Sequence, residues 1–165
     1  MGNLQKIKVT VKIDGASNIF KITPESDLNK LKKKIEKRTN IPVDDQELYN
    51  YKGKPLHDSL TLKSLENISE NELYLYKKSE LFEIKVSEKR NNYSYNEDEY
   101  FIIKVHENME IHFIEMIYNS QSKHSCNDSL IFNNIDLQSS RLVKDYDIKK
   151  GSHLVNYYSY SFRKG

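Results

Sequence analysis

The stretch LNKLKKKIEKRTNIPVDDQEL, residues 28–48, decides the fold. Its first half places Leu28, Leu31 and Ile35 at the spacing i, i+3, i+7, which aligns them on one face of a helix. The other helical positions are mostly charged, so only one face is apolar. A helix with a single apolar face covers one side of a sheet, and the stretch therefore predicts a helix packed on one sheet face.

The ends of this helix are indicated by the residues that flank it. Ser26 or Asp27 can cap the start, because either side chain can accept a hydrogen bond from an unpaired backbone N–H of the first turn. Ile41-Pro42 is expected to end the helix, because proline disfavours helical backbone in the residue before it.

Strands are predicted on both sides of the helix. In KIKVTVKI, residues 6–13, apolar and polar residues alternate with the period of a half-buried strand. Asp14-Gly15 is a turn signal that leads into a second strand, NIFKITP at 18–24. Two further short strands follow the helix: QELYNY at 46–51 and NELYLY at 71–76.

The chain repeats this plan after about 80 residues. TLKSLENISENELYLY at 61–76 is echoed by RLVKDYDIKKGSHLVNYY at 141–158, and ELYNYKGKPL at 47–56 is echoed by SLIFNNIDL at 129–137. Each echo is weak alone, but their common order and similar offset indicate two copies of one domain. The predicted organisation is a first domain at 3–78, a short linker at 79–80, a second domain at 81–162 and a C-terminal tail at 163–165.

The second copy carries the same elements. MEIHFIEMIY, residues 109–118, places Ile111, Ile114, Ile117 and Tyr118 on one helical face. The predicted strands around that helix are LFEIKVSE at 81–88, DEYFIIKVHE at 98–107, SLIFN at 129–133 and SHLVNYYSY at 152–160.

Composition excludes several classes of protein. At 165 residues with 37% hydrophobic content, the chain suits two small cores better than one large one. A net charge of +2 argues against electrostatic capture by nucleic acid or membranes. No apolar run approaches the length of a membrane span, and the first residues lack a signal-peptide core. With Cys126 as its one cysteine, the chain has no disulfide framework, so a cytoplasmic protein is expected.

Candidate catalytic and metal-ligating residues are few. His124 and Cys126 lie two positions apart in a polar loop, but a cysteine nucleophile needs a positioned base and a third orienting group. The five histidines show no metal-ligand spacing, so neither an enzyme nor a cofactor is expected. The basic run KLKKKIEKR, residues 30–38, is interpreted as the solvated face of the helix rather than a nucleic-acid site, because its apolar residues face the core.

The first copy resembles ubiquitin in KIKVTVK, in the helix with its exit, in YKGKPL and in TLKSLENISENELYLY. The most specific parts are the Ile-Pro-x-Asp-x-Gln run at 41–46 and Gly53-Lys54-x-Leu56. The second copy is more divergent, and LVKDYDIKKGSHLV is its best match. The arrangement resembles the tandem ubiquitin-like modifiers, such as the interferon-induced two-domain modifier and its bacterial counterparts. The resemblance implies an α+β fold of two tandem β-grasp domains, each a mixed sheet packed on one helix.

The resemblance also implies candidate partner-binding residues. The positions of the small apolar patch through which ubiquitin binds partners fall on Tyr49, Tyr74 and Tyr76 in the first copy, and on Ile131, Val155 and Tyr157 in the second. Alternation turns the neighbouring leucines inward, so the three tyrosines are expected to form one exposed aromatic patch. The alternative is that they are ordinary strand tyrosines. Lys54 is a possible chain-linkage lysine.

The resemblance implies the function of a protein modifier that acts through its C-terminal glycine. The Gly165 carboxylate would be activated with ATP, passed to cysteines of an activating and a conjugating enzyme, and joined to an amine of a target protein, from which a deconjugating protease would remove it. Arg163 and Lys164 would serve in recognition of the tail, although Lys164 stands where such modifiers carry a glycine. The alternative is a non-conjugated tandem adaptor that binds partners through its sheets. A monomer is expected.

Overall fold

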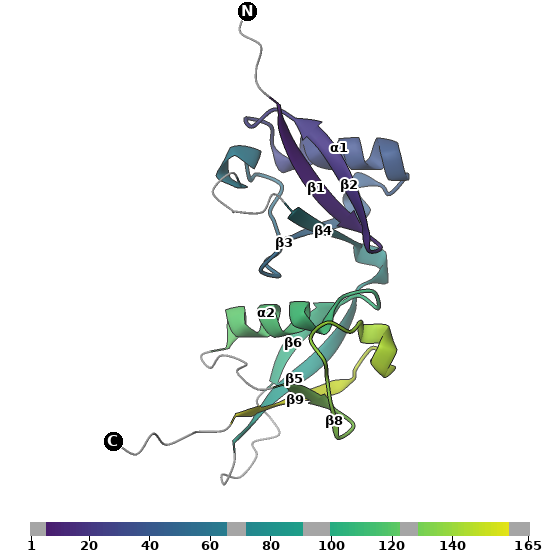
Figure 1. Ribbon diagram of the computed structural model, residues 1–165, viewed down its shortest axis with the longest axis vertical. Coiled ribbons are helices and arrows are strands. Elements are labelled where there is room, and N and C mark those ends of the chain that lie inside the picture. Colours follow the sequence, from purple (N-terminus) through teal and green to yellow (C-terminus); the bar gives the residue numbers. More distant parts are fainter. Residues whose placement is uncertain (1–5, 66–71, 91–99, 123–128, 159–165) are drawn as a thin grey trace, which may run out of the picture. The chain divides into compact units, whose positions relative to one another are not determined.

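The chain divides into two compact units, Met1–Glu80 and Leu81–Gly165. The computed structural model describes residues 6–65, 72–90, 100–122 and 129–158. Each unit contains one mixed sheet and one α-helix (Figure 1). This is the α+β fold with two β-grasp domains that the sequence predicts.

The sheet of the first unit has the strand order β2-β1-β4-β3. β1 pairs antiparallel with β2 and parallel with β4, and β3 pairs antiparallel with β4. Asp14 and Gly15 form the tight turn between β1 and β2, with φ values of 49° and 80°. The elements of this unit are β1 (Ile7–Ile13), β2 (Ala16–Ile22), α1 (Leu28–Thr39), β3 (Gln46–Asn50) and β4 (Glu72–Lys77), with 3-10 turns at Val43–Asp45, Leu62–Leu65 and Lys78–Glu80.

Helix α1 begins where the sequence predicts and ends earlier. Asp27 is the N-cap, and its Oδ1 accepts a hydrogen bond from the Lys30 backbone N–H at 2.8 Å. At the other end the helix stops at Thr39, not at Ile41-Pro42 as expected. Asn40 adopts a left-handed φ of 60° and donates its backbone N–H to the Glu36 carbonyl. Asparagine tolerates this conformation better than most residues, so it ends the helix before the proline can act.

The core of the first unit lies between α1 and one face of the sheet. The predicted stripe of α1 is fully buried there, beside valines, isoleucines and leucines of the strands. Two polar side chains border this core. Gln46 Nε2 donates to the carbonyls of Lys32 and Ile41, at 3.0 and 2.8 Å, and Lys32 Nζ lies 2.6 Å from Asp58 Oδ1. These bonds tie the helix to β3 and to the loop that carries Asp58.

The sheet of the second unit has the strand order β6-β5-β9-β7-β8. Its first and last strands in sequence, β5 and β9, pair in parallel, just as β1 and β4 do in the first unit. The two-residue strand β8 is an addition to the predicted elements. The elements are β5 (Phe82–Arg90), β6 (Tyr100–Val105), α2 (Ile111–Gln121), β7 (Leu130–Phe132), β8 (Ile135–Asp136) and β9 (His153–Tyr158), with a 3-10 turn at Val143–Tyr146.

Helix α2 buries the predicted face. Its three predicted isoleucines and Tyr118 are buried, as is Phe113. The Tyr118 hydroxyl donates to Glu88 Oε1 at 2.5 Å, and the Ser122 hydroxyl donates to the same oxygen at 2.6 Å. Burial, followed by the hydrogen bond to Glu88, raises the pKa of Tyr118 to about 12. The polar end of α2 is therefore fixed to β5 by a shared carboxylate.

Two further observations concern the described residues as a whole. None of the helices found there has the length and apolar character needed to cross a membrane. The same residues include no group of three or more His, Cys, Asp or Glu side chains placed to hold a metal ion.

Candidate partner-binding faces of the two sheets

The predicted partner-binding residues lie on the sheet faces that point away from the helices. In the first sheet, Leu48 pairs with Leu75, and both belong to the core that α1 covers. The same register pairs Tyr49 with Tyr74. Because successive side chains of a strand point to opposite faces, the tyrosines lie on the face away from α1, which is the orientation expected from the sequence.

The expected exposure of this aromatic patch is wrong for two of its three residues. Tyr49 is only 5% exposed and Tyr76 only 9% exposed. Their rings meet edge to face, with centroids 5.8 Å apart and an interplanar angle of 68°. Burial, with a smaller effect of nearby Glu47, raises the pKa of Tyr49 to about 12. Strand alternation gives the face of the sheet on which a ring lies, but not the neighbours that cover it.

The third residue, Tyr74, is half-buried and engaged with charged neighbours. Lys12 Nζ lies 5.1 Å from the centroid of its ring and 3.0 Å from Glu72 Oε1. The Tyr74 hydroxyl donates to Glu72 Oε2 at 3.3 Å. The hydrogen bond to Glu72 is the main cause of the raised pKa of Lys12, whereas burial is the main cause of the raised pKa of Tyr74. This face is thus a packed polar network more than an open apolar patch.

The second sheet places its predicted residues together. Ile131 of β7 pairs with Val155 of β9, and Tyr157 follows on the same face two residues later. All three side chains are half-buried. The intervening Leu154 and Asn156 are buried on the other side of β9. The three predicted residues therefore lie on the sheet face away from α2.

Two residues that the sequence reasoning did not select extend this face. Tyr100 is 41% exposed and Ile102 is 52% exposed. Ser87 of β5 pairs with both Tyr100 and Val155, and Val155 pairs with Ile131, so the five side chains from β6, β9 and β7 share one face of the sheet. The signal was present in DEYFIIKVHE, where the alternating Phe, Ile and Val face inward and leave Tyr100 and Ile102 outside. We call this set the outer face of the second sheet: Tyr100, Ile102, Ile131, Val155 and Tyr157.

Lysines from β5 lie over the aromatic rings of the outer face. Lys85 Nζ is 4.4 Å from the centroid of the Tyr100 ring. Lys89 Nζ is 5.2 Å from the centroid of the Tyr157 ring and donates to its hydroxyl at 3.3 Å. A surface of aromatic and aliphatic side chains with cations beside them suits a protein partner that brings apolar and acidic side chains.

A serine and a histidine also meet on the outward side of this sheet. His153 Nε2 lies 2.8 Å from Ser87 Oγ. Ser87 has no exposed surface, because it lies between β6 and β9 in the middle of the sheet. A serine nucleophile must reach its substrate, so this pair is a structural contact.

Of the remaining candidate residues, only Lys54 lies within the residues that the structure describes. Lys54 is exposed in the turn after β3, and its backbone N–H donates to Asn50 Oδ1 at 3.0 Å. Its side chain is therefore accessible on an anchored turn. The tail residues Arg163, Lys164 and Gly165 lie outside the described residues, as do His124 and Cys126. The last described residue, Tyr158, ends β9.

Comparison with known proteins identifies the first unit. Residues 7–79 match the model of the ubiquitin family. The match extends from the start of β1 through α1 to just beyond β4. No curated protein gives a significant match to the chain. Residues 7–79 therefore form a ubiquitin-like domain.

Proposed function

We propose that this chain is a ubiquitin-like protein modifier, activated through the carboxylate of Gly165 and conjugated to amines of target proteins. The observation that carries the proposal is the position of β9. This strand is parallel to the first strand of its sheet, as β4 is in the ubiquitin-like domain, and residues 159–165 follow it directly. In the resembling modifiers the reactive tail leaves the last strand in this way.

The proposed chemistry requires no catalytic group from the chain itself. The carboxylate attacks the α-phosphate of ATP, giving an acyl adenylate and pyrophosphate. A cysteine thiolate of an activating enzyme then displaces AMP and forms a thioester, which passes to a cysteine of a conjugating enzyme. Finally a target amine attacks the acyl carbon, forms an amide and releases the thiol. Glycine suits this position because it has no side chain to obstruct the attacking groups.

Recognition by these enzymes is assigned to the second unit and its tail. The outer face of the second sheet would dock the activating enzyme, with Ile131, Val155 and Tyr157 as its contacts. Arg163 and Lys164 would meet acidic groups near the active site of that enzyme. On the first sheet, Tyr74 is the better candidate for partner binding, since the other two tyrosines are buried. Exposed Lys54 would be the position for linkage of further modifier chains.

The test is a conjugation assay with a chain that ends at Gly165. The purified protein is incubated with ATP and an extract of the cells that encode it, and adducts are detected by gel shift and mass spectrometry. The expected result is ATP-dependent adducts, some of which hydroxylamine removes as thioesters. Deletion of Gly165 should abolish them. Lys150→Ala is the matched control, because it changes an exposed lysine of the second unit outside the tail, keeps the terminal glycine and should keep the adducts.

A non-conjugated adaptor is the second candidate, and the exposed outer face of the second sheet favours it. An adaptor would bind its partners without ATP and without a covalent bond. Its complexes would survive deletion of Gly165 and would be lost in Ile102→Asp. If adducts persist after the deletion, or never form with the cognate activating enzyme, conjugation through Gly165 is refuted and the adaptor function takes its place.

A further inference from the structure

The joint between the two units is short and largely folded. Strand β4 ends at Lys77, the 3-10 turn Lys78–Glu80 follows directly, and β5 begins at Phe82. The boundary between the compact units falls at the end of this turn. Leu81 is therefore the one residue of the joint that belongs to no helix, turn or strand.

A single carboxylate holds the 3-10 turn against the ubiquitin-like domain. Asp45 Oδ1 accepts a hydrogen bond from the Ser79 backbone N–H at 2.8 Å, and Asp45 Oδ2 accepts one from the Ser79 hydroxyl at 2.9 Å. Hydrogen bonds to a charged acceptor are stronger than those between neutral groups. Because both carboxylate oxygens bind the same residue, they also fix its orientation. We call these two bonds the Asp45–Ser79 clamp.

Asp45 is itself held in place by the fold of the first unit. It is the last residue of the 3-10 turn Val43–Asp45, and its backbone N–H donates to the Pro42 carbonyl at 2.9 Å. The next residue, Gln46, begins β3, is fully buried and donates from its side chain to two backbone carbonyls. The clamp therefore ties Ser79 to a part of the domain that the core keeps rigid.

Two ion pairs lie beside the clamp, but they hold the turn less firmly. Lys77 Nζ lies 2.7 Å from Glu80 Oε1, and Lys78 Nζ lies 3.7 Å from Glu47 Oε2. All four side chains are partly exposed, and water weakens the attraction in such pairs. The Asp45–Ser79 clamp is therefore the main attachment of the turn.

The second sheet fixes the other end of the joint. Phe82 pairs with Val105 from the first residue of β5, and the Gly151 backbone N–H donates to the Glu83 carbonyl at 2.8 Å. Each residue of a chain contributes only two soft backbone dihedrals. With both ends of the joint fixed, rotation between the units is concentrated in the φ and ψ angles of Leu81.

We propose that the Asp45–Ser79 clamp is a lock on the joint between the two units. With the clamp closed, residues 78–80 move with the first unit, and Leu81 is the hinge. With the clamp open, the 3-10 turn unfolds locally and becomes part of the hinge, which grows from one residue to the four residues 78–81. The lock does not depend on conjugation of Gly165.

The lock also protects the joint from proteolysis. A protease must bind the chain in an extended form, so cleavage inside the turn requires local opening. When opening and closing are faster than cleavage, the cleavage rate follows the population of the open form. Glu80 ends the turn and is a site for a protease that cuts after glutamate. Cleavage after Glu80 therefore reports how often the clamp opens.

The test digests the full-length chain with a glutamate-specific protease and follows cleavage after Glu80 by mass spectrometry. Asp45→Ala removes both acceptors and should speed this cleavage on the order of tenfold. Ser79→Ala removes only the hydroxyl donor and should speed it about threefold. Asp44→Ala is the matched control, because it removes the same charge from the exposed neighbour in the same turn and should leave the rate unchanged.

Amide NMR of the same proteins distinguishes opening of the clamp from a general loss of stability. Backbone order parameters of residues 78–80 should match those of β4 in the wild type and fall in Asp45→Ala, while the urea midpoint at buried Val11 stays close to that of the wild type. Four results would each overturn the proposal. They are equal cleavage in wild type and Asp45→Ala, faster cleavage in Asp44→Ala, wild-type order parameters of residues 78–80 well below those of β4, and a fall in the Val11 midpoint large enough to account for the cleavage.

Discussion

Tyr49→Ala should lower the stability of the ubiquitin-like domain far more than Tyr157→Ala lowers the stability of the second unit. Both residues occupy positions that the ubiquitin resemblance assigns to partner binding. Tyr49 is 5% exposed and touches the Tyr76 ring, whereas Tyr157 is half-buried at the surface. The first tyrosine is therefore part of the packing, and the second is available for contact with a partner.

The size of the effect follows from the burial of the ring. A buried tyrosine removes about 150–250 Å² from water, worth about 4–6 kcal/mol at about 25 cal/mol per Å² as an upper limit. Measured substitutions of buried aromatic residues by alanine cost about 3–5 kcal/mol. For Tyr49→Ala we expect a loss of about 3 kcal/mol in the free energy of unfolding. In a domain of this size that lowers Tm by about 12–24 °C.

The assay is urea unfolding of the full chain, followed by amide NMR at one buried valine in each core. Val11 reports on the first unit and Val86 on the second. Tyr49→Ala should shift the midpoint only at Val11, and Tyr157→Ala should change the stability at Val86 by less than about 1 kcal/mol. Tyr49→Phe keeps the ring and is the matched control. A loss below about 1 kcal/mol in Tyr49→Ala would refute the packing role of this residue.

Three further predictions concern stability. Burial raises the pKa of Tyr49 from 10.0 to about 12, so between these pH values the folded state keeps a proton that the unfolded state releases. The free energy of unfolding should therefore fall from pH 10 to pH 12. Urea midpoints should show a smaller fall for Tyr49→Phe. Asp58→Ala leaves the buried Lys32 ammonium without its carboxylate and should lower the free energy of unfolding by about 2 kcal/mol, measured by thermal melts. Lys32→Met leaves only an exposed, hydrated Asp58, so it should lower the same free energy by less than about 1 kcal/mol. Asn40→Val forces a β-branched residue into the left-handed conformation and should lose about 1–2 kcal/mol, while Asn40→Gly should be nearly neutral by the same measurement.

The inward faces of the elements could be predicted from the sequence because periodicity determines them directly. Leu31 and Ile35 of α1, and Ile114 and Ile117 of α2, are buried where their spacing placed them. The end of α1 was less predictable. Both Asn40 and Pro42 could end the helix. Which of them does so depends on whether Asn40 enters the left-handed region, as it does here.

The outward faces were predicted less well because exposure depends on neighbours from other strands. Tyr49 and Tyr76 are diagonal neighbours on β3 and β4, and each large ring covers part of the other. No pattern within one strand contains that information. Tyr100 and Ile102 show the opposite case, since their alternation was visible but nothing in β6 alone indicated that Val155 and Tyr157 would continue the same surface.

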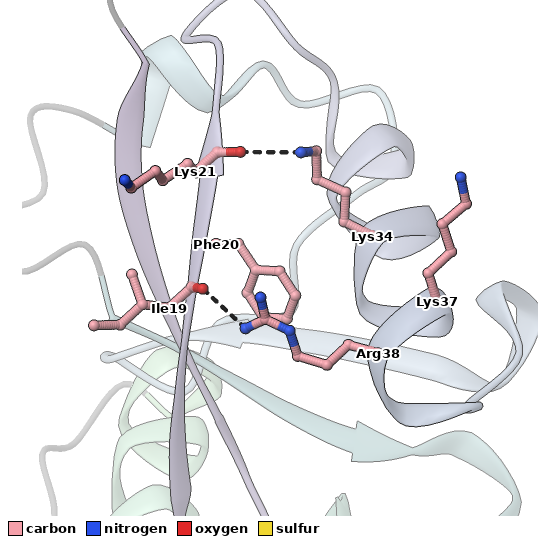
Figure 2. A pocket seen from close by; sticks show the side chains of 6 residues that line it. All are labelled: Ile19, Phe20, Lys21, Lys34, Lys37 and Arg38. Carbon is pink, nitrogen blue, oxygen red and sulfur yellow. Dashed lines mark hydrogen bonds between the residues drawn. The ribbon is translucent and has the colours of Figure 1, made fainter.

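The net charge of +2 conceals the distribution of charge that governs binding. On the first sheet, Lys12 lies over Tyr74 but also forms an ion pair with Glu72, so its charge is neutralised locally. On the second sheet, Lys85 and Lys89 lie over rings, and within the described residues neither is within 4.0 Å of a carboxylate oxygen. In the first unit, a groove between β2 and α1 is lined by four cations (Figure 2), and none of its six lining residues is acidic; they are Ile19, Phe20, Lys21, Lys34, Lys37 and Arg38. Two local surfaces of positive charge attract acidic partners even when the net charge of the whole chain is nearly zero. Salt at 0.1 M screens such attraction within about 10 Å, so binding at either surface should weaken as ionic strength rises.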